Sequence, residues 1–336
     1  MFKKIFEFLY IKVFVNIIMQ DTKTFVYIEN ISNNKTVTKV QESFETAVLS
    51  SEMYEFISKY IDESPYHYIS ILNPSHAQGA IPTCDKSKEF YYADVSESLL
   101  VCINRWSTYT PKKELKSLDV IYRKIGLDFI FSPFTILSTF FKKEITQDVA
   151  LYILLEEQNI SVMIFKNAEL LYAKYMNVED EPEDDSNLLT YDVDLDDGID
   201  LEDIDAMEDI DMFDDFNDIE DLDDISEIDE FSDSKDIEDD FSTEDVENSA
   251  DGASSQADTF TADYQRFSLI QTAINSFYND EKYESLFLEN AYIADSTGAG
   301  TDLTQYLEEE MFLTIHFRVI NLGAELSQSA QEELNI

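Results

Sequence analysis

The sequence predicts an α/β fold in which one plan of strands and helices occurs twice. Groups of three short β-forming runs, separated by polar turns, occur at residues 13–40 and again at 149–176. Later in each half come helices with one apolar face and a further strand. Between the halves lies a long stretch of acidic residues. These observations predict two similar lobes that face each other across a cleft, together with a long acidic insertion.

Local patterns justify the elements of the first half. Met53 and Ile57 are four positions apart, on one face of a helix that Pro65 ends. Pro111 suits the first position of another helix, and Gly126 suits its end. The first lobe is expected to span residues 1–147. After its three strands we expect a helix at 51–61, strands at 68–72, 89–93 and 99–104, a helix at 111–125, an extended segment at 129–131 and a helix at 133–141. Residues of about 80–131 are expected to form an inserted subdomain.

The second half repeats this plan. Residues 149–156 are apolar almost throughout, which indicates a strand in the middle of a sheet. The second lobe, residues 148–178 plus 259–322, is expected to hold two further strands, a helix at 264–278, a strand at 290–294, a glycine-containing loop at 296–300, a helix through 303–307 and a strand at 313–319. The last residues, 323–336, are interpreted as a tail.

The acidic insertion, residues 179–258, is predicted to be disordered. Residues 179–247 hold 35 Asp and Glu against one basic residue, Lys235. An apolar residue recurs at every third position between residues 201 and 231, a period that matches neither an α-helix nor a strand. A highly charged segment without a consistent apolar face cannot bury a core. It is therefore either a solubilising spacer or a docking tail for a basic partner surface.

Composition excludes several classes of function. The chain has a net charge of −48 and no cluster of Lys and Arg, so direct binding to nucleic acid is not expected. The two cysteines, Cys84 and Cys102, form no metal-binding motif and are interpreted as a reduced, intracellular pair. His67, His76 and His316 are scattered, so no zinc site is predicted. No apolar run reaches the length of a membrane span. Residues 1–19 are basic and apolar; they either touch a membrane surface or merely lead into the first strand.

Two stretches resemble a known fold. Residues 99–141 carry LLVCI at 99–103, a helix, GL at 126–127 and Pro133; residues 265–322 carry TGAGTDL at 297–303 and YLEE at 306–309. Their order resembles the actin-like (ASKHA) fold and, more narrowly, the PilM family of type IV pilus assembly and the related cytoplasmic domain of GspL in type II secretion. The resemblance covers most of residues 10–178 and 259–322. It implies a two-lobed fold with an inserted subdomain.

The sequence departs from that resemblance at the nucleotide site. Actin-like ATPases hold phosphate between turns rich in Asp, Gly and Thr. Glycine in these turns lets the backbone approach the phosphates. Here the turns at 20–23 and 156–159 contain no glycine, and only the third loop keeps any. The residues predicted to form these vestigial nucleotide loops are Asp21, Glu156, Glu157, Gly298 and Gly300. We therefore expect neither catalytic residues nor a required cofactor, with ATP binding left as the alternative.

These inferences lead to one expected function and two alternatives. The resemblance implies a non-catalytic cytoplasmic scaffold of a type IV pilus, type II secretion or DNA-uptake (competence) machine, held peripherally at the inner membrane by its partners. Its partners would be the N-terminal peptide of a PilN-like membrane protein and the assembly ATPase. The alternatives are an active actin-like ATPase or kinase, and an acidic adaptor that acts through its insertion.

Overall fold

A computed structural model describes residues 10–33, 35–145, 148–179, 251–298 and 301–334, without the side chains of 251–261 and 301. The described residues up to 179 and from 252 onward belong to one compact unit. The predicted disordered insertion, residues 179–258, lies almost entirely outside the described part of the chain. Its last residues are an exception, because helix α6 (Asp251–Asn279) begins earlier than the sequence predicts.

The first sheet contains five strands in the order β3-β2-β1-β4-β8. The first three form the antiparallel meander that the sequence predicts, and β4 and β8 continue the sheet in parallel. Their bounds are β1 (Lys12–Met19), β2 (Thr24–Ser32), β3 (Lys35–Phe44), β4 (Tyr66–Leu72) and β8 (Phe129–Phe131). Strand β8 therefore belongs to this sheet and not to the inserted subdomain, which the sequence analysis extended to residue 131.

The second sheet repeats the first, with the order β11-β10-β9-β12-β13. Again three antiparallel strands come first, and two parallel strands follow. Their bounds are β9 (Ala150–Leu155), β10 (Asn159–Lys166), β11 (Glu169–Asn177), β12 (Asn290–Asp295) and β13 (Thr314–Val319). The shared order and direction of the strands confirm the predicted duplicated, actin-like α/β fold.

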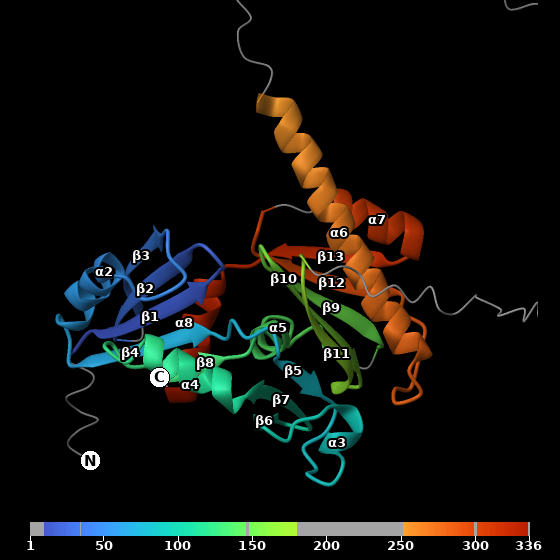
Figure 1. Cartoon of the computed structure of the whole chain (residues 1–336), viewed down its shortest axis with the longest axis horizontal. Coiled ribbons are helices and arrows are strands. Elements are labelled where there is room, and N and C mark those ends of the chain that lie inside the picture. The colour runs from blue at the N-terminus through green and yellow to red at the C-terminus, as the bar shows by residue number, and fades with distance from the viewer. Residues whose placement is uncertain (1–9, 34, 146–147, 180–250, 299–300, 335–336) are drawn as a thin grey trace, which may run out of the picture. The chain divides into compact units, whose positions relative to one another are not determined.

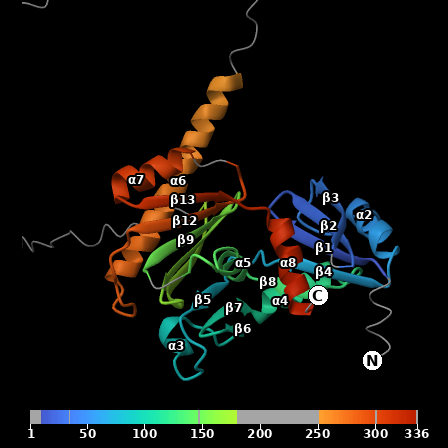
Figure 2. The same ribbon diagram turned by 180° about the vertical axis from the view of Figure 1, so that it is seen from behind.

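Helices lie against the sheets (Figures 1 and 2), and the buried side chains form three apolar clusters. Helices α2 (Ser51–Ile61) and α4 (Lys112–Ile121) pack on one face of the first sheet, through Met53, Ile57 and Leu118. Helices α6 and α7 (Thr301–Met311) cover the equivalent face of the second sheet. Helices α5 (Pro133–Phe140) and α8 (Leu322–Leu334) belong to a third cluster with residues of both sheets, so the two lobes share one apolar core.

The inserted subdomain is a three-stranded sheet in the order β5-β7-β6 with one short helix. Its elements are β5 (Gly79–Ile81), α3 (Glu89–Tyr92), β6 (Ser98–Ile103) and β7 (Trp106–Pro111). Two predictions were wrong here. Residues 89–93, rich in β-forming aromatics, form α3, because the Asp85 carboxylate accepts the Ser87 N–H and turns the chain just before it. Strand β7 was missed; Asn104 adopts a positive φ of 57° and closes the β6–β7 hairpin.

The two cysteines are joined in a disulfide, which contradicts the predicted reduced pair. Strand pairing places Cys102 opposite Ser107 of β7. The Ser107 hydroxyl donates to the carbonyl of Thr83, so the segment that holds Cys84 lies against the same strand. The separation of 18 residues in the sequence did not indicate this contact. The two cysteines meet because both lie against β7, a strand that the sequence analysis did not predict.

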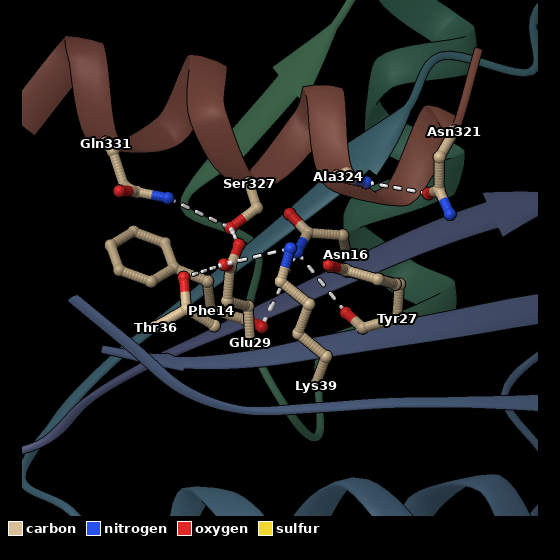
Figure 3. Close-up of polar contacts among 10 residues, drawn as sticks. All are labelled: Phe14, Asn16, Tyr27, Glu29, Thr36, Lys39, Asn321, Ala324, Ser327 and Gln331. Carbon is tan, nitrogen blue, oxygen red and sulfur yellow. Dashed lines mark hydrogen bonds and ion pairs between the residues drawn. The ribbon is translucent and has the colours of Figure 1, made fainter. Parts of the chain in front are cut away.

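The segment predicted as a tail, residues 323–336, instead forms most of helix α8, which packs on the first sheet. Figure 3 shows Ser327 pointing from α8 toward Glu29 of β2, and its hydroxyl donates to the carboxylate at 2.6 Å. The same buried carboxylate accepts a hydrogen bond from Thr36 and lies 3.7 Å from the ammonium of Lys39. Gly323 lies against Tyr27, where a Cβ would come within 2.4 Å of the Tyr27 Cβ. Close packing and a buried polar contact thus hold α8 in place.

None of the helices in the described part of the chain is long and apolar enough to span a membrane.

Candidate functional site

Because the two halves share a topology, their first hairpin turns are equivalent, and the structure brings these turns into contact. The β1–β2 turn holds Asp21, and the β9–β10 turn holds Gln158. The backbone N–H of Asp21 donates to the Gln158 side-chain carbonyl at 3.0 Å. A backbone N–H in this turn is the kind of donor that binds phosphate in an actin-like nucleotide site. Here that donor already has a partner.

Glu156 stands at the start of the second turn and is buried. Burial in an apolar surrounding penalises the charged carboxylate and raises its pKa to about 8. One carboxyl oxygen, Oε1, has no hydrogen-bond partner. Glu156 is therefore mostly protonated at neutral pH, so its neighbour Glu157, which is exposed, carries the negative charge of this turn. Both residues were predicted from the sequence to belong to a vestigial nucleotide loop.

The third loop follows β12, and its donors are bonded within the loop. The buried Asp295 carboxylate accepts the Thr297 N–H at 2.8 Å, the Thr297 hydroxyl at 2.7 Å and the Gly298 N–H at 3.0 Å. Gly298 adopts a φ of +75°, which few other residues tolerate. The glycine predicted from the sequence therefore has a conformational role, but its N–H faces a carboxylate of the chain.

A buried ion pair supports this region. Arg266 of α6 donates to Asp263 at 3.1 Å, and both side chains are almost completely buried. The other Asp263 oxygen accepts the backbone N–H of Leu303 in the first turn of α7. Arg266 also donates to the carbonyl of Glu157 at 3.4 Å. The pair therefore joins α6, α7 and the second hairpin turn.

These loops border a cavity of about 690 Å³, here called the interlobe cavity. Gln20 comes from the first loop, Glu157 from the second and Thr297, with its neighbour Ser296, from the third. The remaining lining is Ile18, Phe25, Tyr27, Gln41, Ala262, Arg266 and residues 320–323. The cavity thus has an apolar wall from the first sheet, one exposed carboxylate and one buried guanidinium.

The predicted site residues differ in their surroundings in the structure. Asp21 contacts the second turn through its backbone, and Glu157 lines the interlobe cavity. Glu156 is buried, and Gly300 lies outside the described residues. Sequence reasoning missed Asp263 and Arg266 as site residues, because an Asp and an Arg three positions apart on a helix usually form a surface pair. Asp295 was not among the predicted site residues, and spacing gave no sign that its carboxylate would accept the hydrogen bonds of the loop N–H groups.

The fold and loops define an actin-like α/β protein with an interlobe site. The chain belongs to the family described as "Domain of unknown function (DUF8341)", whose model matches residues 151–335. A second model, "Domain of unknown function (DUF8569)", matches residues 10–138. No curated protein matches the sequence.

Several solved structures are similar in fold at low identity. The PilM–PilN type IV pilus biogenesis complex gives 10% identity and a TM-score of 0.47, covering 95% of this chain and 93% of that one. A Bacteroides thetaiotaomicron protein with actin-like ATPase fold and unknown function gives 12% and 0.43, covering 95% and 96%. The ethanolamine utilization protein EutJ from Carboxydothermus hydrogenoformans gives 6% and 0.37, covering 94% and 87%. At these scores the fold assignment rests on the duplicated sheet topology.

Proposed function

We propose that this protein is a non-catalytic scaffold, which uses an actin-like fold to bind a partner protein without hydrolysing nucleotide. The proposal rests on one observation, which is that N–H groups of the first and third loops already donate hydrogen bonds within the chain. The Asp21 N–H is bonded to Gln158, and the Thr297 and Gly298 N–H groups are bonded to Asp295. A triphosphate would have to break these bonds and displace a carboxylate that already satisfies the loop.

Electrostatics support the same proposal. A triphosphate entering the interlobe cavity would meet the exposed carboxylate of Glu157, and like charges at close range disfavour binding. The guanidinium of Arg266 offers little compensation, because it is already paired with Asp263. We therefore propose that no nucleotide cofactor is required.

The sequence resemblance to the PilM family supplies the finer part of the proposal. The partner would be the N-terminal peptide of a PilN-like membrane protein, and the assembly ATPase would be a second partner. The machine would be a type IV pilus, type II secretion or DNA-uptake system. The scaffold would then sit in the cytoplasm and reach the inner membrane through its partners.

Calorimetry with Mg·ATP tests the non-catalytic part. We expect no binding heat at micromolar protein, either for the unchanged chain or for Gln158→Ala, which frees the Asp21 N–H but leaves Asp295 in place. Micromolar binding accompanied by phosphate release would refute the scaffold proposal in favour of an actin-like ATPase or kinase.

A binding assay with an immobilised PilN-like N-terminal peptide tests the partner. Retention of the full chain is expected, and a synthetic peptide of residues 201–231 added in solution should not compete. Competition by that acidic peptide would instead support an adaptor that acts through its insertion. Failure of the chain to bind would refute the proposed partner.

A further inference from the structure

A second cavity, of about 370 Å³, lies beside the contact between the two hairpin turns. We call it the hairpin pocket. It is bordered by both turns, by the loop that follows β4 and by helix α4. Its lining residues are Met19, Gln20, Asp21, Ala47, Pro74, Ser75, His76, Ala77, Glu114, Ser117, Leu118, Gln158 and Asn159. Asp21 and Gln158, whose hydrogen bond joins the two turns, both line it.

Apart from His76, the ionisable residues that line the hairpin pocket are acidic. Asp21 is exposed and Glu114 is half-buried, and both line the pocket. Neither carboxylate forms an ion pair with any residue in the part of the chain that the structure describes. No Lys or Arg is among the lining residues. An anionic ligand would be repelled, and a cationic one would be attracted.

Two lining side chains also lack hydrogen-bond partners. Ser75 is 5% exposed, and its hydroxyl oxygen is unpaired. The side-chain oxygen of Asn159 is buried and unpaired as well. Leaving a buried polar atom unpaired is unfavourable. The two residues come from different lobes and line the same pocket, so a ligand with several donors is the kind that could supply the missing hydrogen bonds.

These requirements narrow the chemistry of the ligand. It should carry positive charge and several hydrogen-bond donors, which describes an ammonium or guanidinium group. The apolar residues Met19, Pro74 and Leu118 suit the alkyl stem of such a side chain. A metal ion fits less well, because no group of three His, Cys, Asp or Glu that could hold one occurs among the residues with described positions.

We propose that the hairpin pocket binds a basic side chain, Arg or Lys, of a partner chain. Asp21 and Glu114 would supply the charge, and Ser75 and Asn159 would accept hydrogen bonds. The assignment to a partner rests on the proposed scaffold function, whereas the cation site itself rests on the pocket alone. Because both lobes contribute acceptors, an occupied pocket would also hold the two hairpin turns together.

The test uses the full chain and two peptides that differ in charge alone. Ac-Gly-Arg-Gly-NH₂ carries the guanidinium, and the matching citrulline peptide has nearly the same shape without charge. Amide chemical shifts of Ala77 and Asn159 report binding at the pocket itself, which separates it from attraction of the peptide to the acidic insertion. We expect saturable shifts with the arginine peptide and none with the citrulline peptide.

Variants assign the contacts. Asp21→Asn combined with Glu114→Gln should weaken binding of the arginine peptide by at least about tenfold, since both charge-assisted hydrogen bonds to the guanidinium would be lost. The matched control is Glu308→Gln combined with Glu309→Gln, which removes the same charge from exposed positions on α7 and should leave the affinity unchanged. Ser75→Ala should weaken binding severalfold.

Several outcomes would overturn the inference. Absent shifts at Ala77 and Asn159, equal shifts with the citrulline peptide, or equal weakening in the α7 control would each remove the cation site. Micromolar binding of agmatine, a free alkyl-guanidine, would reassign the site to a small molecule and overturn the partner assignment. If neither the arginine peptide nor ATP binds, the cation site is refuted and the scaffold function is not. ATP hydrolysis with intact arginine binding would refute only the scaffold function.

Discussion

Glu156→Gln tests how the buried carboxyl of the second hairpin turn affects stability. In the folded chain the pKa of Glu156 is raised to about 8, whereas the unfolded chain returns it to its ordinary value near 4.5. Between these two values the folded state holds a proton that the unfolded state has released. Folding stability therefore falls as the pH rises through this window, and it is unaffected by this group below it.

The magnitude follows from the same shift. Each pH unit inside the window changes the free energy of unfolding by about 1.4 kcal/mol. At pH 7 the accumulated loss is on the order of 3 kcal/mol. Glutamine has nearly the same shape as glutamate and does not titrate. The variant should match the wild type near pH 4, apart from a constant offset, and should exceed it in stability by an amount that grows up to pH 8.

Urea denaturation at pH 4, 5, 6, 7 and 8 measures this difference. Trp106, the only tryptophan, is buried against Phe165 of the second sheet, so its fluorescence reports on the core. Glu157→Gln is the matched control, because it makes the same replacement at the neighbouring side chain, which is exposed. A Glu156→Gln difference that is constant with pH, or that grows toward acid, would refute the reasoning.

Three other substitutions test the packing of α8 and the buried ion pair. Gly323→Ala should destabilise the fold by about 1–3 kcal/mol in urea denaturation, because its Cβ would overlap Tyr27; a change near zero would contradict the packing of α8. Ser327→Ala should cost about 1–3 kcal/mol by leaving Glu29 short of a donor, whereas the exposed Gln328→Ala should cost much less. Asp263→Ala should cost about 3–5 kcal/mol, because it leaves the Arg266 guanidinium buried without its partner; thermal unfolding of that variant at the wild-type temperature would contradict the buried pair.

Most of the fold could be predicted from the sequence, because its elements have strong periodic patterns. The strands around residues 13–40 and 149–176 alternate with polar turns, and the duplication follows from their order. Helix α8 was missed because its contact face includes Gly323, Ser327 and Ala330, small residues without an obvious apolar stripe. Such a face is suited to close packing against Tyr27, which sequence patterns do not show.

The candidate site could be predicted only in outline. Missing glycines in the turns at 20–23 and 156–159 drew attention to these loops. The partners of individual side chains could not be predicted, because Asp21 meets Gln158 across 137 residues and Asp263 meets Leu303 across 40. Likewise, the neutral state of Glu156 depends on burial, which results from the complete tertiary packing.

The position of α8 has a consequence for the order in which the chain acquires its structure. Residues 322–334 pack on strands that begin at residue 12, so α8 can complete this face of the first sheet only after the second lobe has been synthesised. Until then the apolar cluster around Phe14 lacks the contacts that α8 supplies. Transiently exposed apolar surface of this kind favours aggregation, which is the hazard that chaperones counter.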